Sequence, residues 1–212
     1  MSLILPQKTA PSCRDAEATK SRILDAAEEE FAKNGLRGAR TEAIAANTGV
    51  TKAMMYYYFS DKEGLYQAVL ERAVRRRVSA MQKVDIDGEA KTALRDLISA
   101  LIDEASHNQN LPAIFMYEGL QNQGRFYAQI SITSVYAPIV QVLERGIETG
   151  QFRKVDPLHT AINMVGICVH YFCSAPNIKH LFPPGTDLYG PEMLEQHKKE
   201  AVELAVASVL LR

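Results

Sequence analysis

Two very short helical patterns joined by a tight turn constrain this chain more than any other feature. Residues 42–47 and 52–58 have helical spacing, and the four residues TGVT (48–51) separate them. Neither segment is long enough to stay helical in water on its own. Each must pack on the other and on a third helix, which the apolar pattern over residues 17–34 supplies. A helix, a glycine-containing turn and a second helix predict a helix-turn-helix unit.

The second short segment carries four consecutive aromatic residues, YYYF at 56–59. On a helical wheel of about 100° per residue they divide between two sides. The side predicted to face a small core holds Met55, Tyr58 and Phe59. The side predicted to face solvent holds Lys52, Ala53, Tyr56 and Tyr57. Outward aromatic rings beside a cation favour a DNA groove, where they pack on sugars and thymine methyl groups and bond to phosphates.

Composition sets the frame for the rest of the chain. The 212 residues are 47% hydrophobic and 23% charged, which is enough apolar material for a sizeable soluble core. The net charge of −1 conceals a basic first part, residues 1–80, and an acidic remainder, residues 81–212. The three cysteines, Cys13, Cys168 and Cys173, match no metal or disulfide spacing, and the first residues contain no long apolar run. We therefore expect a cytoplasmic protein.

Helical periodicity continues to the end of the chain, and no strand-like alternation competes with it. The sequence therefore predicts an all-α protein of about nine helices, with Gly35 as a left-handed cap that closes the first. Residues 1–16 have no period and are expected to form a mobile arm. The predicted helices cover residues 17–34, 41–47, 51–59, 61–81, 89–107, 111–122, 125–149, 157–174 and 191–211.

Residues 157–178 contain no Asp, Glu, Lys or Arg, which raises the alternative of a membrane span. Polar residues, among them His159, Asn163 and His170, interrupt the stretch. Its length and polar content favour a buried core helix over a span.

The stretch TEAIAANTGVTKAMMYYYFSDKEGLYQAVL resembles the DNA-binding signature of the TetR family of one-component bacterial regulators. The preceding ILDAAEEEFAKNGLRGA is similar to the family's first helix. Ala53 stands where the family often has glycine, and Met54 and Met55 replace the more usual Thr and Leu. The resemblance covers about residues 17–70 and is only architectural beyond residue 80. It implies a helix-turn-helix domain over residues 17–62 and a ligand-binding and dimerisation domain over 63–212.

The resemblance also implies roles at single positions. Thr41 and Thr51 would each cap a helix whose N-terminus faces a phosphate, and Lys62 would add its charge at the start of the fourth helix. The plainer alternatives are ordinary caps and a solvated lysine. Arg75, Arg76 and Arg77 are expected to be a solvated part of the long helix. The predicted DNA-binding set is Arg40, Thr41, Thr51, Lys52, Ala53, Tyr56, Tyr57 and Lys62.

Helices 157–174 and 191–211 resemble the pair that forms a dimer bundle in this family. Between them and the fourth helix we expect a mostly apolar effector pocket, which a kink at Pro138 would open. Plain core packing is the alternative for each pocket residue, and the acidic balance of this part argues weakly against an anionic ligand. The predicted effector-binding set is Met116, Tyr117, Phe126, Tyr127, Ile130, Asn163 and His170.

Catalytic, metal-binding and cofactor motifs are absent from the sequence. The predicted function is therefore not enzymatic: a homodimeric repressor that binds a palindromic double-stranded DNA operator and is released by a small-molecule effector. Two alternatives remain open. The C-terminal part could instead recruit a protein partner, or the chain could be a helical small-molecule enzyme with a vestigial DNA-binding unit.

Overall fold

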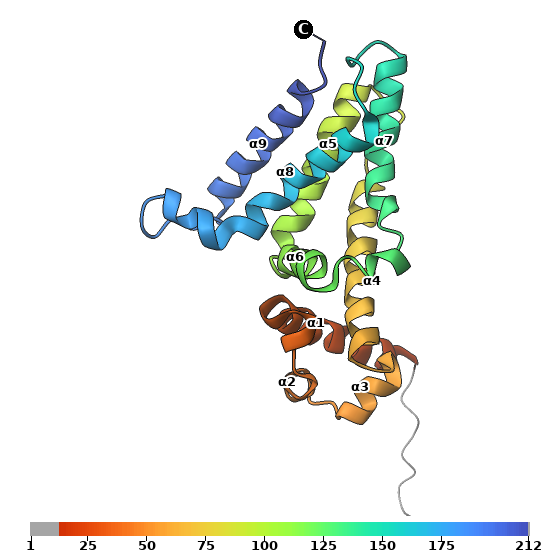
Figure 1. Cartoon of the computed structure of the whole chain (residues 1–212), viewed down its shortest axis with the longest axis vertical. Coiled ribbons are helices and arrows are strands. Elements are labelled where there is room, and N and C mark those ends of the chain that lie inside the picture. The colour runs from red at the N-terminus through yellow and green to blue at the C-terminus, as the bar shows by residue number, and fades with distance from the viewer. Residues whose placement is uncertain (1–12, 212) are drawn as a thin grey trace, which may run out of the picture. The chain divides into compact units, whose positions relative to one another are not determined.

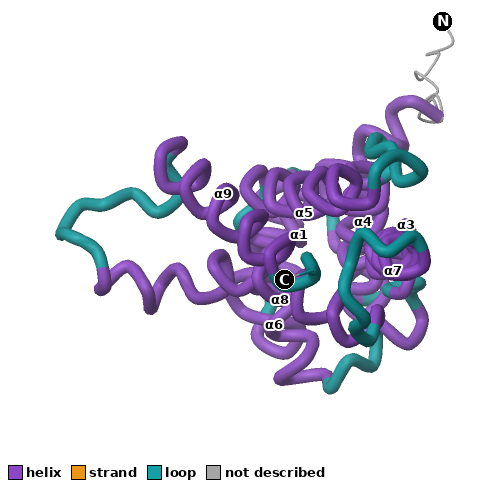
Figure 2. The backbone as a smooth tube through the Cα atoms, turned by 90° about the horizontal axis from the view of Figure 1, so that it is seen from above, coloured by secondary structure: helices purple, strands orange, loops and turns teal. Residues whose placement is uncertain are grey.

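The computed structural model describes residues 13–211, and its elements are helices (Figures 1 and 2). Within those residues the structure contains nine α-helices and no strand, only an isolated bridge between Phe152 and Leu210. The all-α prediction is confirmed. The elements are α1 (Cys13–Gly38), α2 (Thr41–Thr48), α3 (Lys52–Phe59), α4 (Lys62–Met81), α5 (Ala90–His107), α6 (Asn110–Asn122), η1 (Tyr127–Gln129), α7 (Thr133–Glu148), α8 (Pro157–Ile178), η2 (Lys179–Leu181) and α9 (Pro191–Ala207).

The chain divides into two compact units, residues 1–69 and residues 70–212, and α4 begins in the first and ends in the second. In the first unit, one fully buried side chain from each of four helices builds the core: Phe31, Ile44, Met55 and Tyr66. The rings of Phe31 and Tyr66 meet edge to face with centroids 4.9 Å apart, a favoured aromatic geometry. Helices α1, α2 and α3 are thereby held on the first turns of α4.

Local signals end α2 and begin α3 and α4. Gly49 has φ 68°, the left-handed conformation that glycine adopts without steric cost, and it ends α2. The Thr51 side chain accepts a hydrogen bond from the backbone N–H of Met54 at 3.1 Å and so caps α3. Asp61 caps α4 in the same way, because its Oδ1 accepts from the N–H of Gly64 at 2.8 Å.

The first helix extends beyond its predicted range of 17–34 at both ends. Gly35 has the positive φ expected of it, 64°, but helical structure resumes after it and continues to Gly38. The predicted arm over residues 1–16 lies outside the described residues as far as residue 12, and α1 already begins at Cys13.

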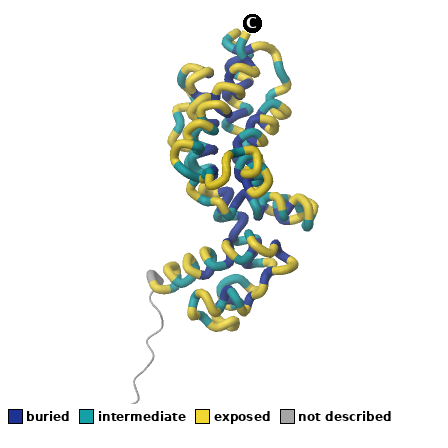
Figure 3. Tube along the Cα trace, turned by 90° about the vertical axis from the view of Figure 1, so that its left-hand side faces the viewer, coloured by how far each residue is buried: buried dark blue, intermediate teal, exposed yellow. Residues whose placement is uncertain are grey.

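The second unit is built around α5, which packs against α7, α8 and α9. Leu94, Leu97, Ile98 and Ile102 recur at helical spacing along α5 and are fully buried, and Figure 3 shows such buried residues on the inner sides of the helices. A glycine is required on α7, because a Cβ at Gly146 would lie 2.1 Å from a ring carbon of Phe152. The core thus sits between α5 and the three helices that cover it.

The prediction of a single helix over residues 125–149 is wrong. The structure has a short 3-10 turn, and then Ile130 is extended (φ −116°, ψ 136°) before α7 begins at Thr133. The cause lies in α6, where the carboxylate of buried Glu118 accepts from the backbone N–H of Phe126 at 2.8 Å. That bond holds the chain in a turn after α6.

Proline residues lie inside two helices. Pro138 lies within α7, and Pro176 lies within α8, which continues to Ile178 instead of ending at the predicted residue 174. Proline removes the N–H that would bond to the carbonyl four residues earlier. For Pro176 that carbonyl belongs to Phe172, and it accepts a hydrogen bond from the Tyr189 hydroxyl at 3.5 Å. In the part of the chain described here, no helix is both long and apolar enough to span a bilayer.

Candidate nucleic-acid interface

The exposed side of α3 carries the cation and aromatic residue that the helical wheel places there. Lys52 and Ala53 are exposed, and the Tyr57 side chain is 84% exposed. Met55 on the opposite side is fully buried. The helix therefore presents a short stripe of Lys52, Ala53 and Tyr57 to solvent while its other side holds the core.

The division of the four aromatic residues is less sharp than the wheel predicts. Tyr56 is half-buried, not outward, because its hydroxyl donates to Thr41 Oγ1 on α2 at 3.3 Å. Tyr58 is also half-buried and does not fill the core; the ammonium of Lys20 lies 5.7 Å from the centre of its ring. The buried aromatic partner of Phe31 is Tyr66 on α4, which the sequence did not single out.

The charge of Lys52 is held by a residue on the preceding helix. Its Nζ lies 2.7 Å from Glu42 Oε1 and 5.7 Å from the ring centre of Tyr56. The hydrogen bond between the two side chains raises the pKa of Lys52 and lowers the pKa of the Glu42 carboxyl. Both side chains are exposed, and exposed ion pairs are weak and screened by salt. Glu42 therefore holds the Lys52 ammonium only weakly.

The predicted capping role of Thr41 is wrong. Arg40 is the N-cap residue of α2, has an extended backbone, and its side chain makes no capping bond. Thr41 is buried, and its hydroxyl is turned toward α3, where it accepts from Tyr56. The backbone N–H of Arg40 is satisfied by Glu30 Oε1 on α1 at 2.9 Å. The Arg40 side chain itself is exposed.

Lys62, predicted to meet a phosphate, is engaged inside the first unit. Its ammonium lies within hydrogen-bonding distance of the backbone carbonyls of Ala39, at 3.2 Å, and Arg37, at 3.4 Å. Carbonyls at the end of a helix attract cations because they lack intrahelical partners. Lys62 therefore ties the start of α4 to the end of α1, a role that the sequence did not indicate.

The prediction of a solvated run at Arg75–Arg77 holds for its first two members and fails for the third. Arg75 and Arg76 are exposed, whereas the Arg77 side chain is 7% exposed. Its Nε lies 3.4 Å from Glu104 Oε2 on α5, and the Glu104 side chain is only 10% exposed. The available signal was spacing, since Arg77 follows Leu70 and Val74 on the buried stripe of α4.

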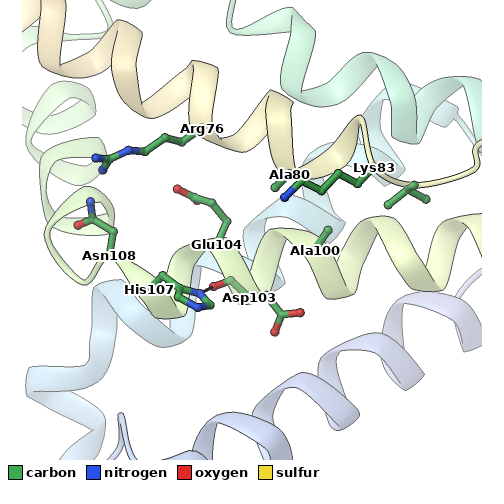
Figure 4. Close-up of a pocket in the computed structure, with 9 residues that line it drawn as sticks. Arg76, Ala80, Lys83, Ala100, Asp103, Glu104, His107 and Asn108 are labelled. Carbon is green, nitrogen blue, oxygen red and sulfur yellow. Dashed lines mark hydrogen bonds between the residues drawn. The ribbon is translucent and has the colours of Figure 1, made fainter. Parts of the chain in front are cut away.

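The buried guanidinium of Arg77 lies among aromatic and thiol groups of the second unit. It is 6.0 Å from the ring centre of Phe115. Burial raises the pKa of Tyr127 to about 12 and that of Cys168 to about 12, and in both cases the nearby Arg77 charge opposes the rise. Tyr127 and Cys168 therefore carry no charge at physiological pH. Of the side chains named here, Glu104, which points from α5 toward α4 in Figure 4, is the one whose charge is opposite to that of Arg77.

Several of the predicted effector residues border hollows of the second unit, and these hollows differ. Met116 and Tyr127 border a small apolar hollow of about 220 Å³. Ile130 borders a second hollow, next to α4. Asn163 and His170 are exposed on α8 and border a third, beside His197 of α9. Phe126 is buried in the core and Tyr117 is half-buried.

The short helices, the capped turn and the exposed stripe on α3 define a helix-turn-helix DNA-binding protein. The chain belongs to the TetR family of bacterial regulatory proteins: residues 23–69 match the family model for the tetR family of bacterial regulatory proteins, and residues 91–205 match the model for the tetracyclin repressor-like C-terminal domain. It is thus a transcriptional regulator and not an enzyme.

Individual relatives agree with this assignment. The HTH-type transcriptional repressor SCO4008 of Streptomyces coelicolor is 26% identical over 191 residues, which are 90% of this chain and 96% of the relative. A tetR-family regulatory protein from Rhodococcus RHA1 shares the fold with a TM-score of 0.75, at 21% identity, over 92% of this chain and 98% of its own. The regulator FadR of Bacillus subtilis, solved in complex with stearoyl-CoA, has a TM-score of 0.72 at 21% identity over 88% and 97% of the two chains.

Proposed function

We propose that this regulator is a homodimeric repressor that binds a palindromic operator through α3 and leaves it when a small molecule binds the second unit. The observation that carries the proposal is the fixed presentation of the first turns of α3. Lys52 and Tyr56 are each bonded to a residue of α2, at 2.7 Å and 3.3 Å. The Tyr56 ring is held in place before binding and so loses less conformational entropy when it meets DNA, whereas the exposed Lys52 can exchange Glu42 for DNA.

Within this proposal the residues at the surface of the first unit have different tasks. Lys52, Ala53 and Tyr57 meet base edges in the major groove, and Tyr56 and Thr51 meet the phosphates beside it. Arg40 reaches the backbone from the start of α2. Residues 17–62 form the DNA-binding domain, and residues 63–212 form the effector-binding and dimerisation domain.

Exposed apolar residues on α8 and α9 support the dimer. Leu158, Ile162 and Leu204 are about half exposed on helices whose other sides are buried. A symmetric pairing of α8 and α9 with a second copy covers them, and an obligate interface of this kind buries about 2,000 Å² or more. Two copies also match two operator half-sites, with centres about 34–36 Å apart.

Release by an effector requires only that the small molecule prefers one of two arrangements of the dimer. A ligand that binds better when the two DNA-binding domains are at another spacing lowers operator affinity by that difference in binding free energy. The complex of FadR with stearoyl-CoA illustrates that a protein with this fold holds a small molecule.

Selection of DNA by the purified full chain tests the proposal. We expect an enriched palindrome with half-sites about 10 base pairs apart, protection of both halves in a footprint, and lower expression of a reporter that carries the site. Enrichment of one unpaired half-site, or higher reporter expression, would contradict it.

A further inference from the structure

Two charged side chains of the first unit bind the turn between α1 and α2 from opposite sides. The carboxylate of Glu30, a half-buried residue of α1, accepts a hydrogen bond from the backbone N–H of Arg40 at 2.9 Å. The ammonium of Lys62, at the start of α4, donates to the carbonyls of Ala39 at 3.2 Å and Arg37 at 3.4 Å. Both charges match the backbone that they meet, because the N-terminus of a helix attracts an anion and the C-terminus attracts a cation.

Glu30 supplies the capping group that the N-terminus of α2 lacks. Arg40 occupies the N-cap position, and its own side chain makes no capping hydrogen bond within the described residues. A helix of eight residues is not stable in water by itself, so other parts of the fold must fix its ends. The Glu30 carboxylate is itself oriented, because the side-chain amide of Asn34 donates to the same Oε1 at 3.0 Å. The start of α2 is therefore held by a residue ten positions earlier in the chain.

The first turn of α2 carries two residues that hold side chains of α3. Thr41 accepts a hydrogen bond from the hydroxyl of Tyr56 at 3.3 Å, and Glu42 binds the ammonium of Lys52 at 2.7 Å. Both follow directly after the backbone N–H that Glu30 holds. A shift of this turn therefore moves the partners of Lys52 and Tyr56.

We propose that Glu30 is a positioning residue for the DNA-binding surface, which it serves without contacting DNA itself. The inference rests on the proposed function, in which Tyr56 and Lys52 meet the operator. Glu30 acts through a series of contacts that leads from its carboxylate to the start of α2, and from Thr41 to Tyr56. Because the carboxylate occupies the backbone N–H of Arg40, an operator phosphate at this helix end meets the Arg40 side chain instead of that N–H.

Operator titrations of full-length variants, at a temperature well below their melting points, test the proposal. Glu30→Ala removes the acceptor, and we expect operator affinity to fall about five- to tenfold, on the scale of a lost N-cap interaction. Glu30→Gln removes the charge but keeps an acceptor oxygen, and it should lose less than about twofold. Glu29→Ala, at the exposed neighbour on α1, is the matched control and should also change the affinity by less than about twofold.

A double-mutant cycle with Tyr56→Phe distinguishes positioning from a general loss of stability. If Glu30 acts through the Thr41–Tyr56 bond, the double variant loses clearly less operator affinity than the product of the two single losses. A residue that only stabilises the fold gives losses that multiply. Multiplying losses, equal losses in Glu30→Ala and Glu30→Gln, or an unchanged affinity in Glu30→Ala would overturn the proposal.

Hydrogen exchange at the Arg40 amide separates this inference from the function on which it rests. Protection of that amide should be lost in Glu30→Ala and kept in Glu30→Gln, in the absence of DNA. This result, in a wild-type protein that selects no operator, keeps Glu30 as the anchor of α2 and contradicts the proposed function. Unaltered protection in Glu30→Ala overturns the anchor itself, whatever the operator titrations show.

Discussion

The two units differ in where one ion pair of each lies. The first buries Phe31, Ile44 and Met55 and keeps the charge of Lys52 at the surface, in a bond to Glu42 of another helix. The second encloses the Arg77–Glu104 ion pair in its interior and leaves apolar residues such as Ile162 at its surface.

We infer from this difference what each surface meets. A solvated surface with bonded polar groups suits a charged, hydrated partner such as DNA. Exposed apolar residues on packed helices suit an apolar partner, which under the proposed function is a second copy of the chain. A buried ion pair contributes little stability against a hydrophobic replacement, so the Arg77–Glu104 pair, which joins α4 to α5, points to a role other than added stability.

The largest effect is expected at the apolar surface of the second unit. Ile162→Glu places two unpaired charges in the symmetric interface, one from each copy, and a buried unpaired charge costs about 3–5 kcal/mol. We expect dimer affinity to fall by about 1,000-fold or more, and operator binding to fall with it. Sedimentation velocity measures the first effect and operator titration the second.

Leu120→Glu is the control for this prediction. Leu120 is 76% exposed, more than Ile162 at 47%, but it lies on α6 instead of α8 or α9. We expect its variant to remain a dimer. Dissociation of the Leu120→Glu variant, or a stable Ile162→Glu dimer, would place the interface elsewhere.

The next largest effect is expected at the buried ion pair. Arg77→Met removes the guanidinium beside the buried Glu104 carboxylate, which should lower the free energy of unfolding by about 3–5 kcal/mol. Adding Glu104→Leu should restore most of that loss, since an apolar pair of similar size is often as stable. The control variant Arg75→Met should change the free energy of unfolding by about 0.5 kcal/mol at most. Denaturant unfolding of all three variants measures these values. If Glu104→Leu does not restore the stability lost in Arg77→Met, the interpretation of Arg77 and Glu104 as a buried ion pair is wrong.

An intermediate effect distinguishes the tyrosines at positions 56 and 58. Tyr56→Phe removes the donor to Thr41, a buried hydroxyl, and should lower the free energy of unfolding by about 1 kcal/mol as well as weaken operator binding. Tyr58→Phe keeps the ring beneath Lys20 and should change stability by less than about 0.5 kcal/mol. Melting curves and operator titrations compare the two. Equal effects would show that the Tyr56–Thr41 bond does not position α3.

A structural feature can be predicted from the sequence when the residues that form it are close together along the chain. The caps at Thr51 and Asp61 and the left-handed Gly49 depend on three or four neighbouring residues, so the pattern locates the helix-turn-helix closely. The Tyr56–Thr41 bond joins residues 15 apart, and the Lys62–Ala39 bond joins residues 23 apart. Such bonds depend on how the helices cross, which no local pattern contains.

The second unit is less predictable because long-range contacts override its local signals. Pro176 normally ends a helix, but the Tyr189 hydroxyl replaces the missing donor to Phe172 and α8 continues. Arginine is rarely buried, and the burial of Arg77 requires Glu104 from another helix. The positions of the predicted effector residues were hard to predict for a related reason. Helical periodicity shows which residues face inward, but not whether they line a cavity or a packed core.

The smallest expected effect concerns the Lys52–Glu42 pair, and it tests whether the surface of the first unit selects its DNA. Glu42→Gln frees Lys52 and removes a negative charge from the proposed interface. Non-specific DNA should then bind a few-fold more tightly, with a salt slope steeper by about one unit, because one more phosphate is neutralised. The preferred operator should gain less, because there Lys52 already leaves Glu42 for the base edge, so the ratio of specific to non-specific affinity should fall. Titration of operator and random duplexes across a salt series measures both. The control is Glu29→Gln, an exposed acid on α1, which should leave the ratio unchanged; an unchanged ratio in Glu42→Gln as well would mean that this ion pair has no part in choosing the site.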